Sequence, residues 1–425
     1  MKIKAIKKTI KERGLWEAIL YYACRFLSKS SMRILGKYTS SRPVKPNRIV
    51  FKNREMQDFT DNARALFEYL VENGYNEKYE IIYMVSQKKH FRKNSIPHVR
   101  FVTAESPRSF TSPLAYYYGA TAHYFFYTNH SADLNRYHGR GQVTVNLWHG
   151  CGYKGTVRNN RDVPHSDTMA AFDYAIVPGP VFVRTKAAYW GCEEKKLLPL
   201  GYPRYDWMLD PANDKRAFLK RLFGWEEDTK TVIWMPTFRK SSLEGYGENS
   251  ISLPYDLPAL EGEEEMGLLD EHLRRLKLLL IVKKHPMQVG WSEKRAAYTN
   301  IRYVTDELLR EKDVLLYRLV GICDALISDY SSIAVDYLLL DRPLAFVLTD
   351  YQRYQDTRGF VFENPLDYMP GEKVFTFRQL LEFFTHVKEG QDLFREERRR
   401  LLPVMHNQSE RYCRRLAEYF LEEPR

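Results

Sequence analysis

Apolar strands that alternate with helices, and then begin that alternation a second time, constrain the fold of this 425-residue chain more than any other feature. Six strand-like runs fall in the first half, with helical stretches such as 60–73 and 107–119 between several of them. Their bounds are Arg48–Asn53, Tyr79–Ser86, Val99–Thr103, Ala122–Asn129, Gln142–His149 and Tyr174–Gly179. Near-continuous apolar strands alternating with helices are typical of a parallel sheet covered on both faces.

The alternation restarts after a turn-rich passage, Gly201–Asp214. The later strands are expected at Thr231–Phe238, Leu278–His285, Ile301–Thr305, Ala325–Asp329 and Pro343–Leu348. A Gly- and Glu-rich insertion, Arg239–Gly267, separates the first two of them, and charged helices that include Gln391–Leu421 close the sequence. The length exceeds that of an ordinary single core. We therefore predict two Rossmann-type, doubly wound α/β domains, 46–208 and 209–425.

The first 45 residues are expected to form a separate basic amphipathic helical segment. Residues 1–37 carry ten Lys and Arg against two Glu, and Leu15–Leu27 is rich in aromatic and aliphatic side chains. That stretch is shorter than the ~20 apolar residues of a spanning helix, and it lacks the cleavage site of a signal peptide. Such a helix fits an in-plane anchor on an anionic membrane surface. The alternative is a helix packed on the first domain with a solvated basic face.

The charge balance indicates a polyanionic partner, since the net charge is +11 and the pI about 9.1. An anionic bilayer, a phosphorylated substrate and nucleic acid all satisfy that requirement. No motif that reads DNA or RNA is evident, so we do not expect a nucleic-acid partner. Five scattered cysteines, with no C-x-x-C pair, argue against a disulfide framework or a structural zinc site and fit a reducing cytosol.

Residues Gly150–Gly155 match the pattern G-x-G-x-x-G directly after a strand. In a dinucleotide-binding fold this pattern follows the first strand, and an acidic residue follows the second strand. Here it follows about the fifth strand, and Asp173 precedes the next one. NAD binding is therefore not expected. His149, at the carboxyl end of its strand, is instead a candidate general base, with Gly150 and Lys154 as substrate-binding candidates. The alternative is a structural histidine in a turn.

Polar residues also follow three strands of the second half. The candidates are Thr237 and Arg239 in "MPTFRK", Lys284 and His285 in "VKKHP", and Asp329, Ser331, Ser332 and Asp336 in "SDYSSIAVD". Ser331 and Ser332 either cap a helix or present hydroxyls and N–H groups to a phosphate. Asp336, one turn later, could accept hydrogen bonds from a ribose, and Arg239 suits a bidentate phosphate contact. Each alone is more often structural, but together they indicate a phosphate site.

The segments "NLWHG", "GYPRYD", "MPTFRK", "KKHP", "SDYSSIAVDYLLLDRPLAFVLTDYQRY" and "RGFVFENPLDYMPG" resemble the CDP-glycerol:glycerophosphotransferases of teichoic acid biosynthesis. The resemblance implies a GT-B-like pair of Rossmann domains with an inter-domain cleft. It also implies a CDP-alditol donor held by the C-terminal half, a lipid-linked polyol-phosphate or glycan acceptor, and a peripheral position on the cytoplasmic face of the membrane.

The expected reaction moves glycerol phosphate, or ribitol phosphate, to an acceptor hydroxyl and releases CMP. His149 would deprotonate that hydroxyl, while His285 and Lys284 would stabilise the leaving phosphate. No metal held by the protein is required, although Mg²⁺ can accompany the nucleotide. One departure is that Cys151, Gly152 and Tyr153 stand where the family has Thr-Pro-Leu, which is expected to alter the acceptor pocket. The alternative is a GT-B glycosyltransferase with a nucleotide-sugar donor.

Overall fold

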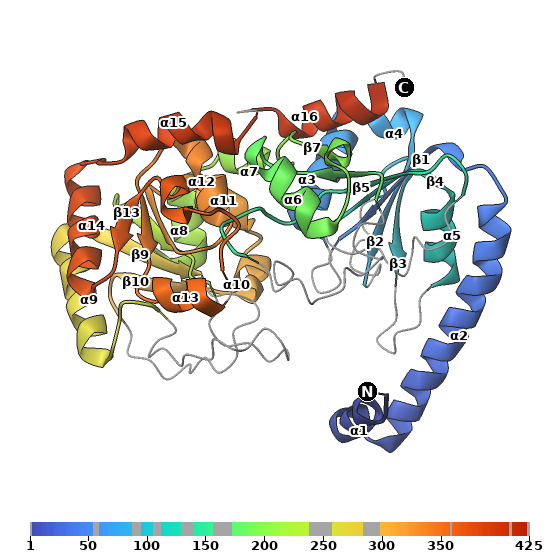
Figure 1. Ribbon diagram of the computed structural model, residues 1–425, viewed down its shortest axis with the longest axis horizontal. Coiled ribbons are helices and arrows are strands. Elements are labelled where there is room, and N and C mark those ends of the chain that lie inside the picture. Colours follow the sequence, from blue (N-terminus) through green and yellow to red (C-terminus); the bar gives the residue numbers. More distant parts are fainter. Residues whose placement is uncertain are drawn as a thin grey trace.

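The computed structural model describes residues 2–53, 59–86, 95–104, 112–128, 139–155, 172–237, 257–283, 298–357, 359–407 and 410–422. These residues form two parallel β-sheets, each flanked by helices, which lie side by side along the long axis of the molecule (Figure 1). The predicted α/β class with two doubly wound sheets is confirmed, and the arrangement of the halves is GT-B-like.

The first sheet has seven strands in the part of the chain that is described, in the order β3-β2-β1-β4-β5-β6-β7. Their bounds are β1 Lys45–Lys52, β2 Glu80–Val85, β3 Val99–Thr103, β4 Ala122–Tyr127, β5 Val143–Asn146, β6 Tyr174–Ile176 and β7 Leu197–Leu198. All neighbours are parallel, and the central strand β1 pairs Phe51 with Tyr83 on one side and with Phe126 on the other. The stacked rings of these three residues fill one face of the sheet, and the paired side chains of Val50, Ile82 and Phe125 are buried on the other.

The second sheet repeats this plan with six strands among the described residues, in the order β10-β9-β8-β11-β12-β13. Their bounds are β8 Lys230–Trp234, β9 Leu278–Lys283, β10 Ile301–Val304, β11 Ala325–Ser328, β12 Leu344–Val347 and β13 Glu372–Val374. The order reverses between β8 and β11, as it does between β1 and β4 in the first sheet. The crevice outside the carboxyl ends of the strands at such a reversal is where open α/β sheets bind ligands.

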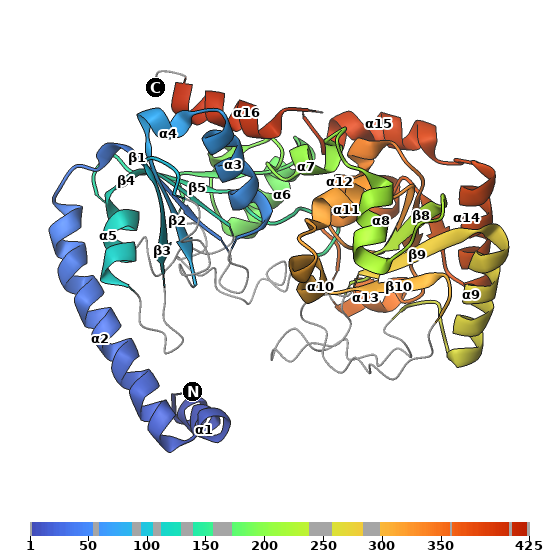
Figure 2. The same ribbon diagram turned by 180° about the vertical axis from the view of Figure 1, so that it is seen from behind.

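Helices cover both faces of each sheet (Figures 1 and 2). In the first half the bounds are α1 Lys2–Arg13, α2 Leu15–Ser40, α3 Asp61–Glu72, α4 Tyr75–Lys78, α5 Pro113–Thr121, α6 Val181–Trp190, η3 Glu194–Lys196 and α7 Tyr205–Leu209. The later bounds are α8 Lys215–Phe223, α9 Glu263–Leu276, α10 Asp306–Glu311, α11 Leu316–Ile322, α12 Ile333–Tyr337, η4 Leu338–Leu340, α13 Tyr351–Thr357, η5 Pro365–Tyr368, α14 Phe377–Glu389, α15 Arg395–Met405, α16 Tyr412–Ala417 and η6 Glu418–Glu422.

The strand predictions are confirmed in position, and most of the observed strands end one to four residues earlier. Two strands were missed, β7 and β13, because runs of two and three residues carry too little periodicity to be recognised. The predicted insertion Arg239–Gly267 is wrong at its end, since α9 begins at Glu263. Three acidic residues in its first turn complement the positive end of that helix.

The end of the chain, which is predicted to belong to the domain 209–425, returns to the first half. In Figure 1, α16 lies above the first sheet, beside α4. The Asp206 carboxylate accepts hydrogen bonds from the backbone N–H groups of Tyr412 and Cys413, and the Phe420 ring lies 5.5 Å from that of Phe126. The predicted boundary after residue 208 also falls inside α7.

Helices α1 and α2 extend beyond the first half as an arm (Figures 1 and 2). The inner face of α2 buries small residues, among them Ala18 and Gly36, and the helix packs against α5. Large apolar residues of this arm are exposed: Leu15, Trp16, Ile19, Leu20, Phe26, Leu27, Ile34 and Tyr38. Among the described residues, none of the helices combines the length and apolarity needed to cross a bilayer.

Candidate functional site

The loop that follows β5 carries the candidate base, and its backbone carbonyls are held in place one by one. The Asn62 amide donates to the carbonyl oxygens of Leu147, at 3.1 Å, and Trp148, at 2.9 Å. Arg204 donates through Nη2 to the carbonyl of His149 at 3.0 Å. The Trp148 indole donates to the carbonyl of Gly150 at 2.8 Å. The backbone on both sides of His149 is therefore fixed by side chains from three separate segments.

Trp148 adopts a backbone conformation that a bulky residue rarely takes. Its φ of +49° lies in the left-handed region, where residues with large side chains are uncommon and strained. Such strain persists only where surrounding contacts impose it, and it gathers at functional sites. The Trp148 ring is buried, and the partly exposed imidazole of His149 lies against it with ring centroids 4.1 Å apart.

The two glycines after His149 admit the second half of the molecule rather than a bound phosphate. A Cβ atom on Gly150 would lie 2.4 Å from Oγ of Ser332. A Cβ atom on Gly152 would lie 2.8 Å from both the backbone N and the Cα of Ser332. In this structure Ser332 fills the space beside Gly150, and the approach of an acceptor or phosphate to this glycine stays a prediction. The close approach joins the "WHG" loop directly to the "SDYSS" turn.

The loop then runs on into the second half. The backbone of Lys154 forms an antiparallel bridge with Phe360, and Gly155 N–H donates to the carbonyl of Gly359 at 2.8 Å. Tyr153 is fully buried, with its ring 5.7 Å from that of Phe346. Cys151 is fully buried as well. The residues that replace Thr-Pro-Leu thus lie at the junction between the halves, and the altered acceptor pocket expected from them stays a prediction.

Asp336, which is predicted to contact a ribose, is enclosed at this junction. Its carboxylate is completely buried and accepts hydrogen bonds from Arg204, at 2.9 Å, and from the hydroxyls of Tyr205 and Tyr317. Burial raises the pKa of both tyrosines, so both stay protonated as donors. Three donors surround this one buried carboxylate, and their hydrogen bonds hold the two halves together.

Arg204 joins four parts of the molecule. Besides Asp336 and the His149 carbonyl, it pairs with Asp61 at the start of α3, at 2.7 Å, and its guanidinium lies 4.3 Å from the ring centroid of Tyr317. A planar guanidinium with several donors suits this task, whereas the single ammonium of a lysine would not. Arg204 belongs to the recognised segment "GYPRYD", but sequence reasoning gave it no role.

Asp329 and Thr237 bind each other across neighbouring strand ends. The Asp329 carboxylate accepts hydrogen bonds from the Thr237 backbone N–H, at 2.9 Å, and from its hydroxyl, at 2.5 Å. Both residues are buried. These bonds tie the end of β8 to the end of β11, and the contact of both residues with substrate stays a prediction.

The structure therefore brings together five of the predicted residues: His149, Gly150, Lys154, Ser331 and Ser332. All five are partly exposed. The helix predicted to begin near Ser331 is α12, for which Ser332 is the N-cap. Three other predicted residues, Arg239, Lys284 and His285, lie outside the described residues.

Sequence reasoning also missed Asn62 and Lys186. Asn62 stands at the start of a helix, where a buried amide that serves a distant loop cannot be told from an ordinary polar residue. Lys186 lies on α6, and its amine is 5.2 Å from the ring centroid of Trp148. A helix rich in aromatic residues gives no signal that its lysine faces a strand-end loop.

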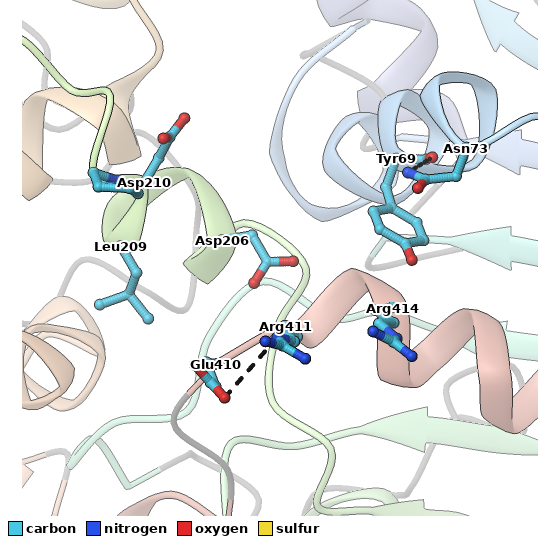
Figure 3. Close-up of a pocket in the computed structure, with 9 residues that line it drawn as sticks. Tyr69, Asn73, Asp206, Leu209, Asp210, Glu410, Arg411 and Arg414 are labelled. Carbon is cyan, nitrogen blue, oxygen red and sulfur yellow. Dashed lines mark hydrogen bonds and ion pairs between the residues drawn. The ribbon is translucent and has the colours of Figure 1, made fainter.

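A cavity of about 560 Å³ lies elsewhere, where α7 and the start of α16 meet α3 (Figure 3). Figure 3 shows Asp206, Arg411 and Arg414 around it, with Tyr69 on the opposite wall. None of the predicted site residues lines this cavity. Across the described ranges, no group of three or more His, Cys, Asp or Glu side chains could hold a metal ion.

A model of the family described as CDP-glycerol:poly(glycerophosphate) glycerophosphotransferase matches residues 34–418. The chain is 25% identical over 344 residues to a teichoic acid poly(glycerol phosphate) polymerase of Staphylococcus epidermidis, covering 77% of this chain and 44% of that protein. It is 29% identical over 232 residues to a teichoic acid ribitol-phosphate primase of Bacillus spizizenii, covering 52% and 55% respectively. The chain thus spans about half the length of these relatives.

The fold is similar to that of a solved structure of the wall teichoic acid polymerase TagF. The TM-score is 0.70 with 19% sequence identity, and the match covers 95% of this chain and 96% of that one. At this level of identity the likeness establishes the two-sheet architecture alone. The residues at the junction determine which chemistry is possible.

Proposed function

Because this chain belongs to the CDP-glycerol:poly(glycerophosphate) glycerophosphotransferase family, we propose that it transfers an alditol phosphate from a CDP-alditol to a hydroxyl of a membrane-linked teichoic acid or capsule-type acceptor. Glycerol phosphate is the proposed unit, and ribitol phosphate is the second candidate because one relative is a ribitol-phosphate primase. The observation that carries the proposal is the meeting of the "WHG" loop with the "SDYSS" turn at Gly150, Gly152 and Ser332.

In the proposed reaction, the acceptor hydroxyl attacks the β-phosphorus of the CDP-alditol. A bond forms between the acceptor oxygen and phosphorus, the bond to the CMP oxygen breaks, and CMP leaves with that electron pair. His149 takes the hydroxyl proton. Charge spreads over the phosphoryl oxygens in the transition state, so positioning and electrostatic stabilisation dominate the catalysis. A base fixed by hydrogen bonds on both sides of its backbone meets the requirement for positioning.

The proposed donor site lies on the second half. Ser331 and Ser332 stand at the turn that meets the His149 loop, where partly exposed hydroxyls can donate to phosphate oxygens. Arg239, Lys284 and His285 are proposed to complete the diphosphate site, with His285 stabilising or protonating the leaving phosphate. Lys154 is proposed on the acceptor side. Cationic side chains at phosphate positions make a metal held by the protein unnecessary, and Mg²⁺ can arrive with the nucleotide.

Turnover of a His149→Ala variant tests the proposal. Loss of a general base typically lowers the rate by about 10²–10⁴-fold, while binding of CDP-glycerol should remain near the wild-type level. CMP release from CDP-glycerol and CDP-ribitol measures the first quantity, and calorimetric titration the second. His123→Ala is a matched control, since His123 is a partly exposed histidine that hydrogen-bonds to the Pro46 carbonyl and stacks on the ring of Tyr124, away from the junction residues.

Near-wild-type CMP release by His149→Ala would remove His149 from the role of base. A wild-type enzyme that is inactive on both CDP-alditols but turns over a nucleotide-sugar would favour the alternative glycosyltransferase. Retention of activity after EDTA treatment would support the absence of a required metal, and loss that only added Mg²⁺ restores would contradict it.

We further propose that the protein acts on the cytoplasmic face of the membrane as a peripheral protein. The exposed apolar residues of α2, beside the lysine-rich α1, support this placement. A helix with that composition binds an anionic bilayer through apolar burial and attraction of its cations.

A further inference from the structure

The amine of Lys186 lies among three aromatic rings of the first half. Its distances to the ring centroids are 5.2 Å for Trp148, 4.7 Å for Tyr189 and 5.6 Å for Trp190. All three are within the range in which a cation is attracted to an aromatic face. Lys186 stands on α6, which in Figure 1 lies in the first half near the middle of the molecule.

The charge of Lys186 has no acidic counterpart in the part of the chain that the structure describes. The described titratable group that influences it is the Cys151 thiol. Burial raises the pKa of that thiol, so it stays neutral. Burial likewise lowers the pKa of the Lys186 amine. Aromatic faces compensate only part of the cost of removing an ammonium group from water, so the site favours an anion that a ligand supplies.

The position of Lys186 indicates which ligand carries that anion. The indole of Trp148 contacts both the Lys186 amine and the imidazole of His149. His149 and Lys186 therefore neighbour the same indole, and a ligand with its hydroxyl at His149 must extend past that ring to place an anionic group at Lys186. The proposed donor phosphates lie at Ser331 and Ser332 of the second half.

We propose that Lys186 binds the phosphate of the acceptor chain that neighbours the attacking hydroxyl, so that the acceptor subsite selects a phosphodiester-linked alditol over a neutral glycan end. This inference deepens the proposed function and rests on it. An alditol unit carries a terminal hydroxyl at one end and the preceding phosphate at the other. The hydroxyl matches the base, His149, and the phosphate matches the cation, Lys186, which both contact the indole of Trp148. Lys186 is thus proposed as a residue that determines acceptor specificity.

Binding of a minimal acceptor tests the inference without turnover. The probes are glycerophosphoglycerol, a phosphodiester between two glycerols, and glycerol as its neutral counterpart. Tryptophan fluorescence of the full chain reports occupancy, because two indoles contact the Lys186 amine. Lys186→Met should weaken binding of the phosphodiester by about 10–100-fold, the factor that corresponds to one charge-assisted hydrogen bond. Lys186→Arg should retain most of it, and glycerol should bind equally weakly to every variant.

Arg184→Met is the matched control, since it removes an exposed cation two residues away on the same helix. Equal affinity of the wild-type chain for glycerophosphoglycerol and glycerol would overturn the inference, as would equal losses in Lys186→Met and Arg184→Met. Should Lys186→Met fail to fold, Lys186→Gln takes its place. The comparison of glycerophosphoglycerol with glycerol as ligands of the wild-type chain still tests the inference. Absence of CMP release from wild-type enzyme would contradict the proposed function while leaving this binding result readable.

Discussion

A single methyl group on Gly152 should separate the two halves of the candidate site. The Cβ atom of Gly152→Ala would lie 2.8 Å from both N and Cα of Ser332, and 3.2 Å from the carbonyl carbon of Ser331. Ordinary contacts between heavy atoms lie at about 3.5–4.0 Å, and the obstructing atoms are backbone. No rotamer change can relieve the clash. The loop or the serine turn must therefore retreat by about 0.7–1.2 Å, the gap between those distances.

Two magnitudes follow from that displacement. Overpacking of this kind costs about 1–3 kcal/mol of folding stability, which a chain with a large continuous core should survive. A shift of about 1 Å in a positioned catalytic group can cost about 10²-fold in rate. We therefore expect Gly152→Ala to fold, to melt at a modestly lower temperature and to release CMP from CDP-glycerol about 10²-fold more slowly. Thermal unfolding by circular dichroism and a CMP-release assay measure the two effects.

Gly267→Ala supplies the matched control for the same chemical change. Nothing lies within 4 Å of a Cβ atom at Gly267, and the residue is exposed in α9. Replacing a helical glycine with alanine should stabilise the protein by about 0.5–1 kcal/mol, with turnover unchanged. Wild-type turnover by a folded Gly152→Ala variant would refute the claim that close approach of the halves positions the base.

Three further predictions concern other parts of the molecule. Arg204→Met should lower the free energy of unfolding by about 3–5 kcal/mol, because it leaves the buried charge of Asp336 unpaired; an unchanged urea midpoint would contradict this. Burial lowers the pKa of His406 below its ordinary 6.5. The contribution of His406 to stability is therefore complete above that pH and is lost as the pH falls below it, because the unfolded chain then binds the extra proton. Urea melts of wild type and His406→Gln at about pH 7.5 and about pH 5.5 should show a smaller pH effect in the variant. Trp16→Glu should weaken binding to anionic vesicles about tenfold or more. Leu268→Glu, which makes the same change in charge at an exposed residue of α9, should leave this binding unchanged. Equal flotation of both variants with vesicles would contradict the placement of the arm on a bilayer.

The sheets could be predicted from the sequence because their strands are buried on both faces. A run such as that of β9, with six consecutive buried residues, has few interpretations other than a central parallel strand. The edge strand β13 consists of Glu372, Lys373 and Val374, and its composition does not differ from that of a loop. The return of α16 to the first half was missed for another reason. Its amphipathic pattern requires some apolar partner but does not specify which half supplies it.

The sequence indicates residues of the candidate site but not the side chains that surround them. The sequence places Asp336 four residues after Ser332, hence on the same helical face, but it does not say whether that face points to solvent. Its partners Tyr205 and Tyr317 come from other elements, and they decide that the carboxylate is enclosed. Likewise, Gly150 in the loop after β5 indicates that another part of the molecule or a ligand approaches the backbone closely. Only the placement of the second half identifies that group as Ser332.

Arg204 makes the base and the serine turn parts of one unit. It holds the carbonyl of His149 and the carboxylate of Asp336 at the same time, at 3.0 Å and 2.9 Å. Beyond Gly152, the same loop continues into the second half through Tyr153 and Lys154. Rotation of one half against the other must therefore break these bonds or carry the loop with the second half. Both courses cost free energy, because the first exposes a buried ion pair and the second breaks the bonds by which Asn62 holds Leu147 and Trp148 to α3. The contacts at the junction therefore hold His149 and Ser332 in a fixed relative orientation.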